Sequence, residues 1–337
     1  MTLEFGAWLP QGFIYELDDV PPAGQWSAIV AGAEQIEQLG YESVWLGDHL
    51  HPAPWRNHTR APGTPRYVTP IFELWTTLAA ISQRTSRLRL GQLTTAVTFR
   101  SPALLAKQAA MVDVMSGGRL ELGIGAAWFE AEHRAYAFPF PAARDRIGML
   151  REAVEIVRRM WTEPEVSYTG DHYTVVRAQC DPKPIQTLPP VVIGGSGKST
   201  LRVVAELADK WNFYGAYEDF GPALAQLKQH CSDLGRDLES IRLTWFDTGV
   251  VVRATEAEAK ADVAALRESR GLPPYRSWLW GTPEQVAEKL APFVAAGVRE
   301  FHPQMPEFPS AETRQRFIAE VAPELRRLAP ARTAGKA

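Results

Sequence analysis

The stretch VVIGGSGKSTLRVVAELA, residues 191–208, joins an apolar run to an amphipathic segment through a glycine-rich turn. The run Val191–Ile193 is short and β-branched, which predicts a buried strand. Leu201, Val204, Ala205 and Ala208 recur at intervals of three and four, which predicts a helix with one apolar face. The stretch therefore predicts one strand-to-helix unit of a parallel sheet.

The same unit recurs along the whole chain. Eight strand-like runs alternate with segments of helical period: Leu3–Leu9, Ser43–Gly47, Leu88–Thr95, Leu120–Gly125, Pro190–Gly194, Lys210–Tyr214, Ile241–Val252 and Arg299–Pro303. Eight such units predict an α/β protein with the (β/α)8 TIM-barrel fold, whose usual size is about 250 residues. A doubly wound parallel sheet is the alternative architecture.

A chain of 337 residues leaves roughly 80 residues for insertions into such a barrel. We expect them near residues 52–69, 127–144, 166–188 and 268–281, the third as a hairpin with its turn at Gly170-Asp171. No linker divides the chain, so residues 1–330 are expected to form a single domain, followed by a flexible tail at 331–337.

Helix starts carry their own chemical signals. Ser101-Pro102 and Thr282-Pro283 each place a capping residue before a proline at the first helical position. Thr282 with Gln285, and Thr255 with Glu258, have the spacing of capping boxes.

The composition excludes several classes of protein. With 45% hydrophobic and 22% charged residues the chain is globular, and a net charge of -3 gives it no basic surface for nucleic acid. No apolar run approaches the roughly 20 residues of a membrane span, and the N-terminus lacks a signal-peptide pattern. The two cysteines, Cys180 and Cys231, are too few to stabilise a chain of this length by disulfide bonds. We therefore expect a cytoplasmic protein with reduced cysteines, no nucleic-acid partner and no membrane.

The glycines at residues 194, 195 and 197 predict an anion-binding turn. Glycines let the backbone approach a phosphate, and a helix N-terminus adds partial positive charge. Lys198 and Ser199 would lie in the first helical turn. The ATP-binding pattern G-x-x-x-x-G-K-[ST] fails because Val192 stands where its first glycine must be. A tight turn without a ligand is the alternative.

Gly123-Ile124-Gly125-Ala126-Ala127-Trp128 also follows a strand. As a dinucleotide-binding pattern it fails, because Trp128 replaces the third glycine, and the doubly wound fold loses its main support. Two interpretations remain open. The small residues either let a flat ring lie against the backbone, with Trp128 and Phe129 as walls, or they serve close packing in the barrel.

Asp48 and His49 follow the second strand, where polar side chains of a barrel face the active site. Histidine is the usual proton-transfer group near neutral pH, so His49 is a candidate catalytic residue. Asp48 either acts beside it or caps a loop. The pair His49 and His51 also suggests a metal-dependent hydrolase, but only His302 offers a further ligand on a later strand. A serine nucleophile is not indicated.

Taken in order, these motifs resemble the luciferase-like monooxygenase superfamily, and within it the oxidoreductases that use the deazaflavin coenzyme F420. The resemblance covers about residues 3–330, through the following segments: FGAWLPQ at 5–11, SVWLGDH at 43–49, LGQLTTAV at 90–97, SPALLAK at 101–107, DVMSGGRL at 113–120, GIGAAW at 123–128, PVVIGGSG at 190–197 and ADKWN at 208–212.

The resemblance implies a coenzyme ring near the ends of strands two to four, against Gly125, Ala126 and Trp128. It implies that the backbone of Gly194, Gly195, Ser196, Gly197 and Lys198 holds the coenzyme phosphate. It further implies a non-prolyl cis peptide at Leu93-Thr94 and a catalytic Asp48-His49 pair, with the histidine beside the ring's reactive carbon.

The chain departs from the relatives that oxidise sugar phosphates. Those proteins carry an acid after the glycines of strand four and another after strand one, where this chain has Trp128 and Gly12. We therefore expect hydride transfer between F420 and a small, apolar organic substrate, with His49 as proton donor or acceptor.

The expected pocket is lined by Trp8, Trp45, Phe99 and Trp128 and covered by the insertions at 52–69 and 268–281. The alternatives are a monooxygenase using reduced FMN and oxygen, a metal-dependent barrel hydrolase and a non-catalytic flavin-binding protein. We also expect a homodimer, as is frequent among the relatives.

Overall fold

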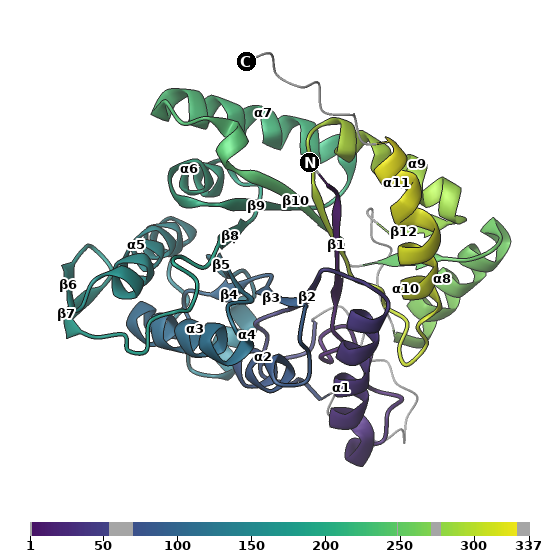
Figure 1. Cartoon of the computed structure of the whole chain (residues 1–337), viewed down its shortest axis with the longest axis horizontal. Coiled ribbons are helices and arrows are strands. Elements are labelled where there is room, and N and C mark those ends of the chain that lie inside the picture. The colour runs from purple at the N-terminus through teal and green to yellow at the C-terminus, as the bar shows by residue number, and fades with distance from the viewer. Residues whose placement is uncertain (1, 54–69, 248, 271–277, 329–337) are drawn as a thin grey trace.

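Parallel strands close into a barrel in the computed structural model, which describes residues 2–53, 70–247, 249–270 and 278–328 (Figure 1). The strand order is β3-β2-β1-β13-β10-β9-β8-β5, and β3 pairs again with β5, which closes the ring and confirms the TIM barrel. The barrel strands are β1 (Glu4–Trp8), β2 (Ser43–Leu46), β3 (Arg89–Gln92), β5 (Leu120–Gly125), β8 (Val191–Gly194), β9 (Lys210–Tyr214), β10 (Arg242–Asp247) and β13 (Glu300–Pro303).

Helices surround the barrel on the outside (Figure 1). They are α1 (Pro22–Gln38), α2 (Leu74–Ser82), α3 (Pro102–Ser116), α4 (Glu130–Ala135), α5 (Ala143–Thr162), α6 (Lys198–Leu207), α7 (Tyr217–Leu234), α8 (Glu256–Arg270), α9 (Pro283–Ala295), α10 (Glu312–Arg316) and α11 (Ala322–Leu328). Their apolar faces pack inward as the periodicity predicts: Leu150, Val154 and Val157 of α5 are all buried. Among the described residues, no helix has the length and apolar character required to cross a bilayer.

The predicted helix starts are confirmed. Ser101 accepts a hydrogen bond from the backbone N–H of Leu104, and α3 begins at the proline that follows it. Thr282 and Gln285 form a reciprocal capping box at the start of α9. Thr255 and Glu258 make the same pair of bonds before α8.

Two predicted strands are each divided in the structure. The run Leu88–Thr95 forms β3 and then β4 (Thr95–Ala96), with a cis peptide bond between Leu93 and Thr94. The run Ile241–Val252 forms β10 and then β11 (Val250–Val252), which leaves the barrel and pairs with β12 (Leu279–Gly281). The prediction of one long strand was wrong: β10 ends at Asp247 and β11 begins at Val250, and at Gly249 a Cβ would lie 2.6 Å from the Trp278 ring, so a side chain there has no room.

Parts of the segments expected to be insertions are among the described residues. The third forms the antiparallel hairpin of β6 (Val166–Thr169) and β7 (Thr174–Ala178). The second contains α4, and β12 lies at the end of the fourth. Residues 54–69, 271–277 and 329–337 lie outside the described residues, and with them most of the first insertion, part of the fourth and the predicted tail. Both cysteines are free and buried.

Charged side chains close the N-terminal end of the barrel. Lys210 Nζ lies 2.8 Å from carboxylate oxygens of both Glu121 and Glu300. Arg242 pairs with Glu300 at 2.5 Å and with Glu4 at 2.7 Å. Each charge faces a partner of opposite sign, which offsets the cost of burying it. Because this end is filled, a ligand site is left to the opposite, C-terminal end.

Candidate active site

A cavity of about 510 Å³ lies at the C-terminal ends of the barrel strands. Its lining comes from the ends of all eight barrel strands and from the loops that follow them: Trp8, Phe13, Asp48, His49, Leu93, Thr94, Ala96, Phe99, Gly125, Ala126, Ala127, Trp128, Phe129, Glu132, His133, Gly194, Gly195, Thr200, Asn212, Tyr214, Phe246 and Gln304. This is the end at which TIM barrels bind their ligands. The predicted residues Asp48, His49, Leu93, Thr94, Gly125, Ala126, Trp128, Gly194 and Gly195 therefore meet in one place.

His49 is held on several sides. Its Nδ1 atom lies 3.1 Å from Oε2 of Glu132. The Phe13 ring stacks on the imidazole with centroids 3.7 Å apart and an angle of 9°, and Trp128 meets it edge-on at 5.7 Å. Because Glu132 engages Nδ1, Nε2 is the ring nitrogen left for a ligand, as far as the described residues show.

Glu132, on α4, lines the same cavity and contacts His49, and the sequence did not single it out. It is 1% exposed, and its Oε1 atom accepts the backbone N–H groups of Leu50 and His51 at 2.5 and 2.8 Å. The carboxylate thus fixes both the imidazole and the loop that carries it. An acidic residue on a short helix is usually solvated, so its burial here gave no signal in the sequence.

Asp48 makes structural contacts with both of its oxygens. Its carboxylate accepts the N–H of Ala96 at 2.9 Å and binds Arg100 Nη1 and Nη2 at 2.5 and 3.1 Å. The pair joins the end of β2 to β4 and to the start of α3. This geometry favours positioning over proton transfer, which is one of the two roles that the sequence left open for Asp48.

Thr94 is enclosed by two glycines. A Cβ at Gly125 would lie 2.3 Å from Thr94 Oγ1, and one at Gly194 would lie 3.0 Å from Thr94 Cγ2. The cis peptide Leu93-Thr94 confirms the bond that the resemblance implies. Each of the two interpretations of the strand-four glycines applies to a different residue. A Cβ at Gly123 would lie 1.5 Å from the Gln92 carbonyl oxygen, so Gly123 serves close packing. Gly125 borders the cavity.

Helix α6 begins beside the same cavity without a side-chain cap. Its N-cap is Gly197, which offers no side chain to the N–H groups of the first turn. Gly195 has φ +120°, a conformation that favours glycine. Uncapped N–H groups and the helix dipole suit an anion, so the residues present fit a phosphate group.

The glycine-rich turn is shared between two cavities. Gly194, Gly195 and Thr200 line the first one. Lys198 lines a second cavity instead, so the Lys198 side chain does not face the cavity at the strand ends. Ser196 and Gly197, on the turn itself, line neither of the two.

Trp45 was wrongly expected in the pocket. It is fully buried, its Nε1 donates to Ser43 Oγ, and its ring lies 4.3 Å from that of His302 in the barrel interior. The prediction was wrong because the aromatic side chain lies one layer below the strand end and fills the barrel. Trp8, Phe99 and Trp128 do line the cavity.

The model of the family described as luciferase-like monooxygenase matches residues 4–277, most of the chain. The chain belongs to the luciferase-like monooxygenase family. This agrees with the resemblance that the sequence motifs carry.

Curated relatives of this luciferase-like protein include enzymes named F420-dependent glucose-6-phosphate dehydrogenase. The one from Intrasporangium calvum is 37% identical over 164 residues, which cover 48% of this chain and 46% of the relative. The chain thus spans about half the length of the first curated relatives it matches. The one from Segniliparus rotundus is 26% identical over 319 residues and matches 87% of this chain and 92% of its own length.

Solved structures show the same barrel. An F420-dependent secondary alcohol dehydrogenase in complex with an F420-acetone adduct matches with a TM-score of 0.76 at 18% identity, over 96% of this chain and 99% of its own. The EDTA monooxygenase from Chelativorans matches with a TM-score of 0.78 at 18% identity, over 98% and 95% of the two chains. These likenesses establish the fold of the luciferase-like chain.

The described residues give the luciferase-like barrel no constellation for a metal ion. Among them, no group of three His, Cys, Asp or Glu side chains has a suitable arrangement. His302, the further ligand that the hydrolase alternative needs, lies in the barrel interior beside Trp45.

Proposed function

We propose that the chain is an F420-dependent oxidoreductase that transfers a hydride between the coenzyme and a small, apolar organic substrate. The observation that carries the proposal is one cavity in which His49, held by Glu132, lies together with Thr94 between its glycines and with an uncapped helix start. The names of the curated relatives support the choice of coenzyme.

Each part of the cavity has a role in this proposal. The backbone from Gly194 to Lys198 holds the coenzyme phosphate, and Leu93, Thr94, Gly125, Ala126 and Trp128 border its ring. When bound, F420 supplies the carbon that accepts or donates the hydride. His49 donates or accepts the accompanying proton through Nε2, while Glu132 fixes the ring by its Nδ1 contact. Asp48 keeps β4 in place through Ala96 and Arg100.

The lining favours an uncharged substrate. Among the described residues that line the cavity there is no Lys or Arg, and the aromatic side chains of Trp8, Phe13, Phe99, Trp128 and Phe246 form much of its wall. A phosphate on the substrate needs cationic or N–H donors, and an apolar wall offers neither. The relatives that oxidise sugar phosphates carry acidic residues where this chain has Trp128 and Gly12. The site therefore favours an apolar organic substrate over a sugar phosphate.

A binding comparison tests the proposal. The purified protein is titrated with F420 and, separately, with FMN, and quenching of the ligand fluorescence is followed. We expect saturable binding of F420 and much weaker binding of FMN. Micromolar FMN binding without F420 binding would overturn the proposal in favour of the FMN-dependent monooxygenase. If a coenzyme binds but the protein converts none of a panel of alcohols and carbonyl compounds, the result would favour the non-catalytic flavin-binding protein.

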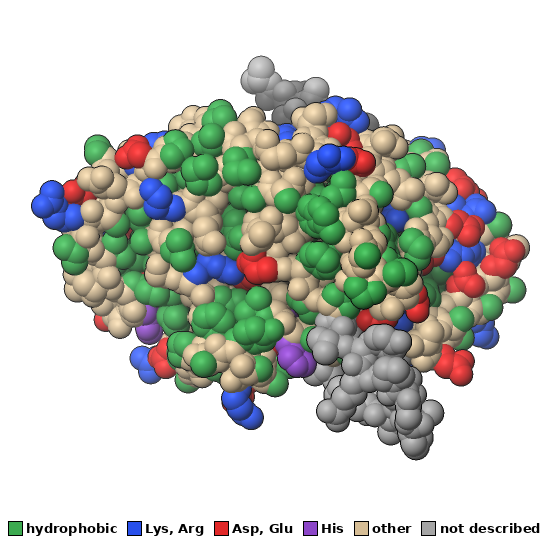
Figure 2. Space-filling model, turned by 90° about the horizontal axis from the view of Figure 1, so that it is seen from below, with side chains coloured by type: hydrophobic (Ala, Val, Ile, Leu, Met, Phe, Trp, Pro, Cys, Tyr) green, Lys and Arg blue, Asp and Glu red, His purple; other side chains and the backbone are tan. Residues whose placement is uncertain are grey.

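A homodimer is part of the same proposal. Figure 2 views the side of the molecule on which α1, α2 and α3 lie, and hydrophobic side chains gather there between charged ones. Leu104, Met111 and Met115 of α3 are exposed at helical spacing, a pattern that suits an interface. Light scattering is expected to give the mass of two chains, and M111E is expected to halve it; a monomeric native protein would contradict this part.

A further inference from the structure

One wall of the cavity at the strand ends lies opposite the residues assigned to the coenzyme ring. Leu93 and Thr94 border the cavity between β3 and β4, and Gly125 borders it at the end of β5. In the closed ring of strands, β10 lies half-way round from β3, and β13 lies half-way round from β5. The ends of β10 and β13 therefore form the opposite wall, and the coenzyme roles proposed above use neither of them.

Aromatic rings form the surface of this wall. Phe246, on β10, stacks on Trp8 of β1 with ring centroids 4.7 Å apart and an angle of 23°. Tyr214, at the end of β9, lies against Phe246 with centroids 5.3 Å apart and an angle of 35°. The three rings are inclined to one another by shallow angles, so together they form one aromatic wall. A planar ring of a ligand gains stacking contacts on such a wall that a saturated ring lacks.

Two amide side chains flank Phe246. Strand β10 pairs with β9, which carries Asn212, and with β13, which Gln304 directly follows. Asn212 donates through Nδ2 to Thr244 Oγ1 at 2.8 Å. Gln304 lines the cavity and is only 5% exposed, and no hydrogen bond joins its side-chain amide to another of the described residues. A buried amide normally has a hydrogen-bond partner, and a polar group of a ligand in the cavity can supply one.

The aromatic wall begins beside His49. A Cβ placed on Gly47 would lie 3.3 Å from His49 Cδ2 and 3.4 Å from Trp8 Cζ3, so only the width of one small group separates the imidazole from the indole. Cδ2 is the ring carbon bonded to Nε2, the nitrogen to which proton transfer is assigned. A substrate whose reacting carbon lies at Nε2 can therefore extend its ring over the aromatic wall.

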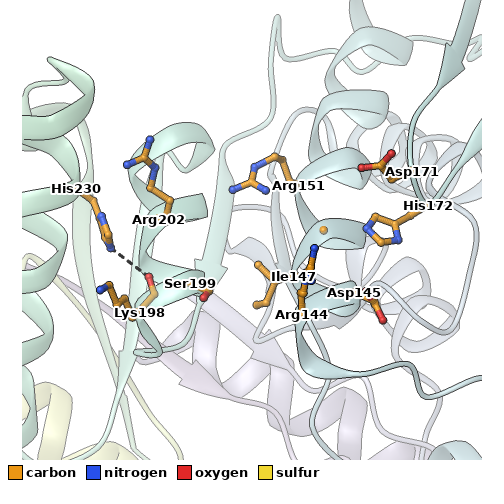
Figure 3. A pocket seen from close by; sticks show the side chains of 11 residues that line it. Arg144, Asp145, Ile147, Arg151, Asp171, His172, Lys198, Ser199, Arg202 and His230 are labelled. Atoms are coloured by element: carbon orange, nitrogen blue, oxygen red, sulfur yellow. Dashed lines mark hydrogen bonds between the residues drawn. The ribbon is translucent and has the colours of Figure 1, made fainter.

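Charged groups lie away from the aromatic wall or are already paired. Figure 3 shows the arginine and lysine side chains of the second cavity, on α5 and α6, and none of them lines the cavity at the strand ends. The carboxylates of Asp48 and Glu132 line that cavity, but they bind Arg100 and His49. A charged substrate would lose its hydration against the aromatic rings without gaining an opposite charge. The wall therefore favours a neutral molecule.

We propose that the substrate is a neutral aromatic carbonyl compound or the corresponding alcohol, with its ring stacked on Phe246 and a polar ring substituent hydrogen-bonded to Gln304. The inference rests on the proposed function, because it names the substrate class of the same site. In the direction of reduction, the carbonyl carbon gains a hydride with its electron pair from the reduced coenzyme, which is thereby oxidised. The π electron pair of the C=O bond passes to the oxygen, which takes the proton of His49 Nε2.

The test compares ketones that differ in their rings. Calorimetry measures the affinity of the native protein, saturated with oxidised F420, for acetophenone and for cyclohexyl methyl ketone, its analogue with a saturated ring. Oxidised coenzyme has no hydride to give to a ketone, so these complexes do not turn over. We expect acetophenone to bind about two- to tenfold more tightly, the range of an aromatic pair. With 4-hydroxyacetophenone we expect a further gain of about two- to tenfold, the range of one neutral hydrogen bond.

Variants assign each preference to one side chain. F246L keeps an apolar side chain, so it is expected to lose the preference for acetophenone over cyclohexyl methyl ketone. Q304L is expected to lose only the gain from the 4-hydroxyl group. W26L is the matched control, because Trp26 of α1 also stacks on a phenylalanine, Phe72, and neither of the two lines the cavity. It is expected to change none of the three affinities. An F420 affinity within about twofold of the native value shows that each variant is folded.

The outcomes separate this inference from the proposed function. Equal affinity of the native protein for acetophenone and cyclohexyl methyl ketone, binding of neither, or a preference for acetophenone that survives in F246L would overturn the aromatic substrate while leaving F420 as the coenzyme. A loss of F420 affinity in Q304L, with the gain from the hydroxyl group unchanged, would assign the amide to the coenzyme and overturn its role here. If the native protein does not bind F420, the proposed function fails, and the inference that rests on it fails with it.

Discussion

His49 and Glu132 lie 83 positions apart in the chain, yet Nδ1 of the imidazole is 3.1 Å from Oε2 of the carboxylate. The second carboxylate oxygen binds the N–H groups of Leu50 and His51, so one buried side chain fixes the ring and the loop behind it. A carboxylate at Nδ1 selects the tautomer in which that nitrogen carries the proton, which leaves Nε2 to exchange a proton with a substrate.

Replacing Glu132 by glutamine is expected to lower kcat while coenzyme binding persists. The amide can no longer accept bonds through both of its terminal atoms, so the imidazole loses its fixed tautomer and orientation. We expect kcat to fall about ten- to hundredfold, within the range that general acid–base catalysis contributes, with the coenzyme Kd unchanged within about twofold.

The control for this variant is E130Q, on the same short helix. Glu130 forms an exposed pair with Arg134, so its loss is expected to leave kcat unchanged. Equal effects of E130Q and E132Q, or a matching loss of coenzyme affinity in E132Q, would assign Glu132 a structural role only.

Replacing His49 by asparagine is expected to remove turnover without removing the coenzyme. The substitution deletes the group assigned to proton transfer, so we expect kcat/KM to fall about 10²- to 10⁴-fold. Fluorescence quenching is expected to show coenzyme binding within a few-fold of the native protein. Unchanged turnover would exclude His49 from the chemistry.

The barrel could be predicted from the sequence because its signals are local. Alternating apolar strands and amphipathic helices predicted the fold, and Ser101 and Thr282 marked helix starts that the structure confirms. The division of the run Ile241–Val252 was missed, because whether a strand stays in the barrel depends on contacts such as that of Gly249 with Trp278, which are distant in sequence.

The site was predictable only where its residues follow strand ends. The cavity brings together His49, Thr94, Gly125 and Gly194 for this reason. Glu132 was missed because its role comes from a contact between α4 and a distant loop. Trp45 was misplaced because the period of a strand gives the side of the sheet but not the depth of a side chain in the barrel.

Replacing Asp48 by asparagine is expected to destabilise the fold. The change leaves Arg100, whose side chain is 10% exposed, without the carboxylate that it binds through two nitrogens. Removing one partner of a buried pair costs about 3 kcal/mol. Urea unfolding measures this loss, and R134Q, which breaks an exposed pair, is expected to cost less than about 0.5 kcal/mol. Equal losses would contradict a structural role for the Asp48–Arg100 pair.

His302 is expected to make stability fall as the pH falls below about 6.5. Its ring is 1% exposed beside Trp45, and burial, together with the nearby positive charge of Lys210, holds the pKa of the folded imidazole well below its ordinary value. In the unfolded chain the same ring takes up a proton near pH 6.5, so below that pH the unfolded state binds a proton that the folded state does not. The contribution of His302 to the free energy of unfolding is therefore fully present above pH 6.5. It declines by up to about 1.4 kcal/mol for each pH unit below 6.5.

Urea unfolding of the native protein and of H302Q at a series of pH values between 7 and 5 isolates this contribution. Other groups titrate in both proteins, including the carboxylates around Lys210, so the quantity to compare is the difference between the two slopes. We expect the native protein to lose stability more steeply than H302Q, because glutamine takes up no proton. H51Q replaces an exposed histidine and is expected to keep the native slope. If H302Q shows the same slope as the native protein, then the imidazole in the barrel is not held neutral by its burial.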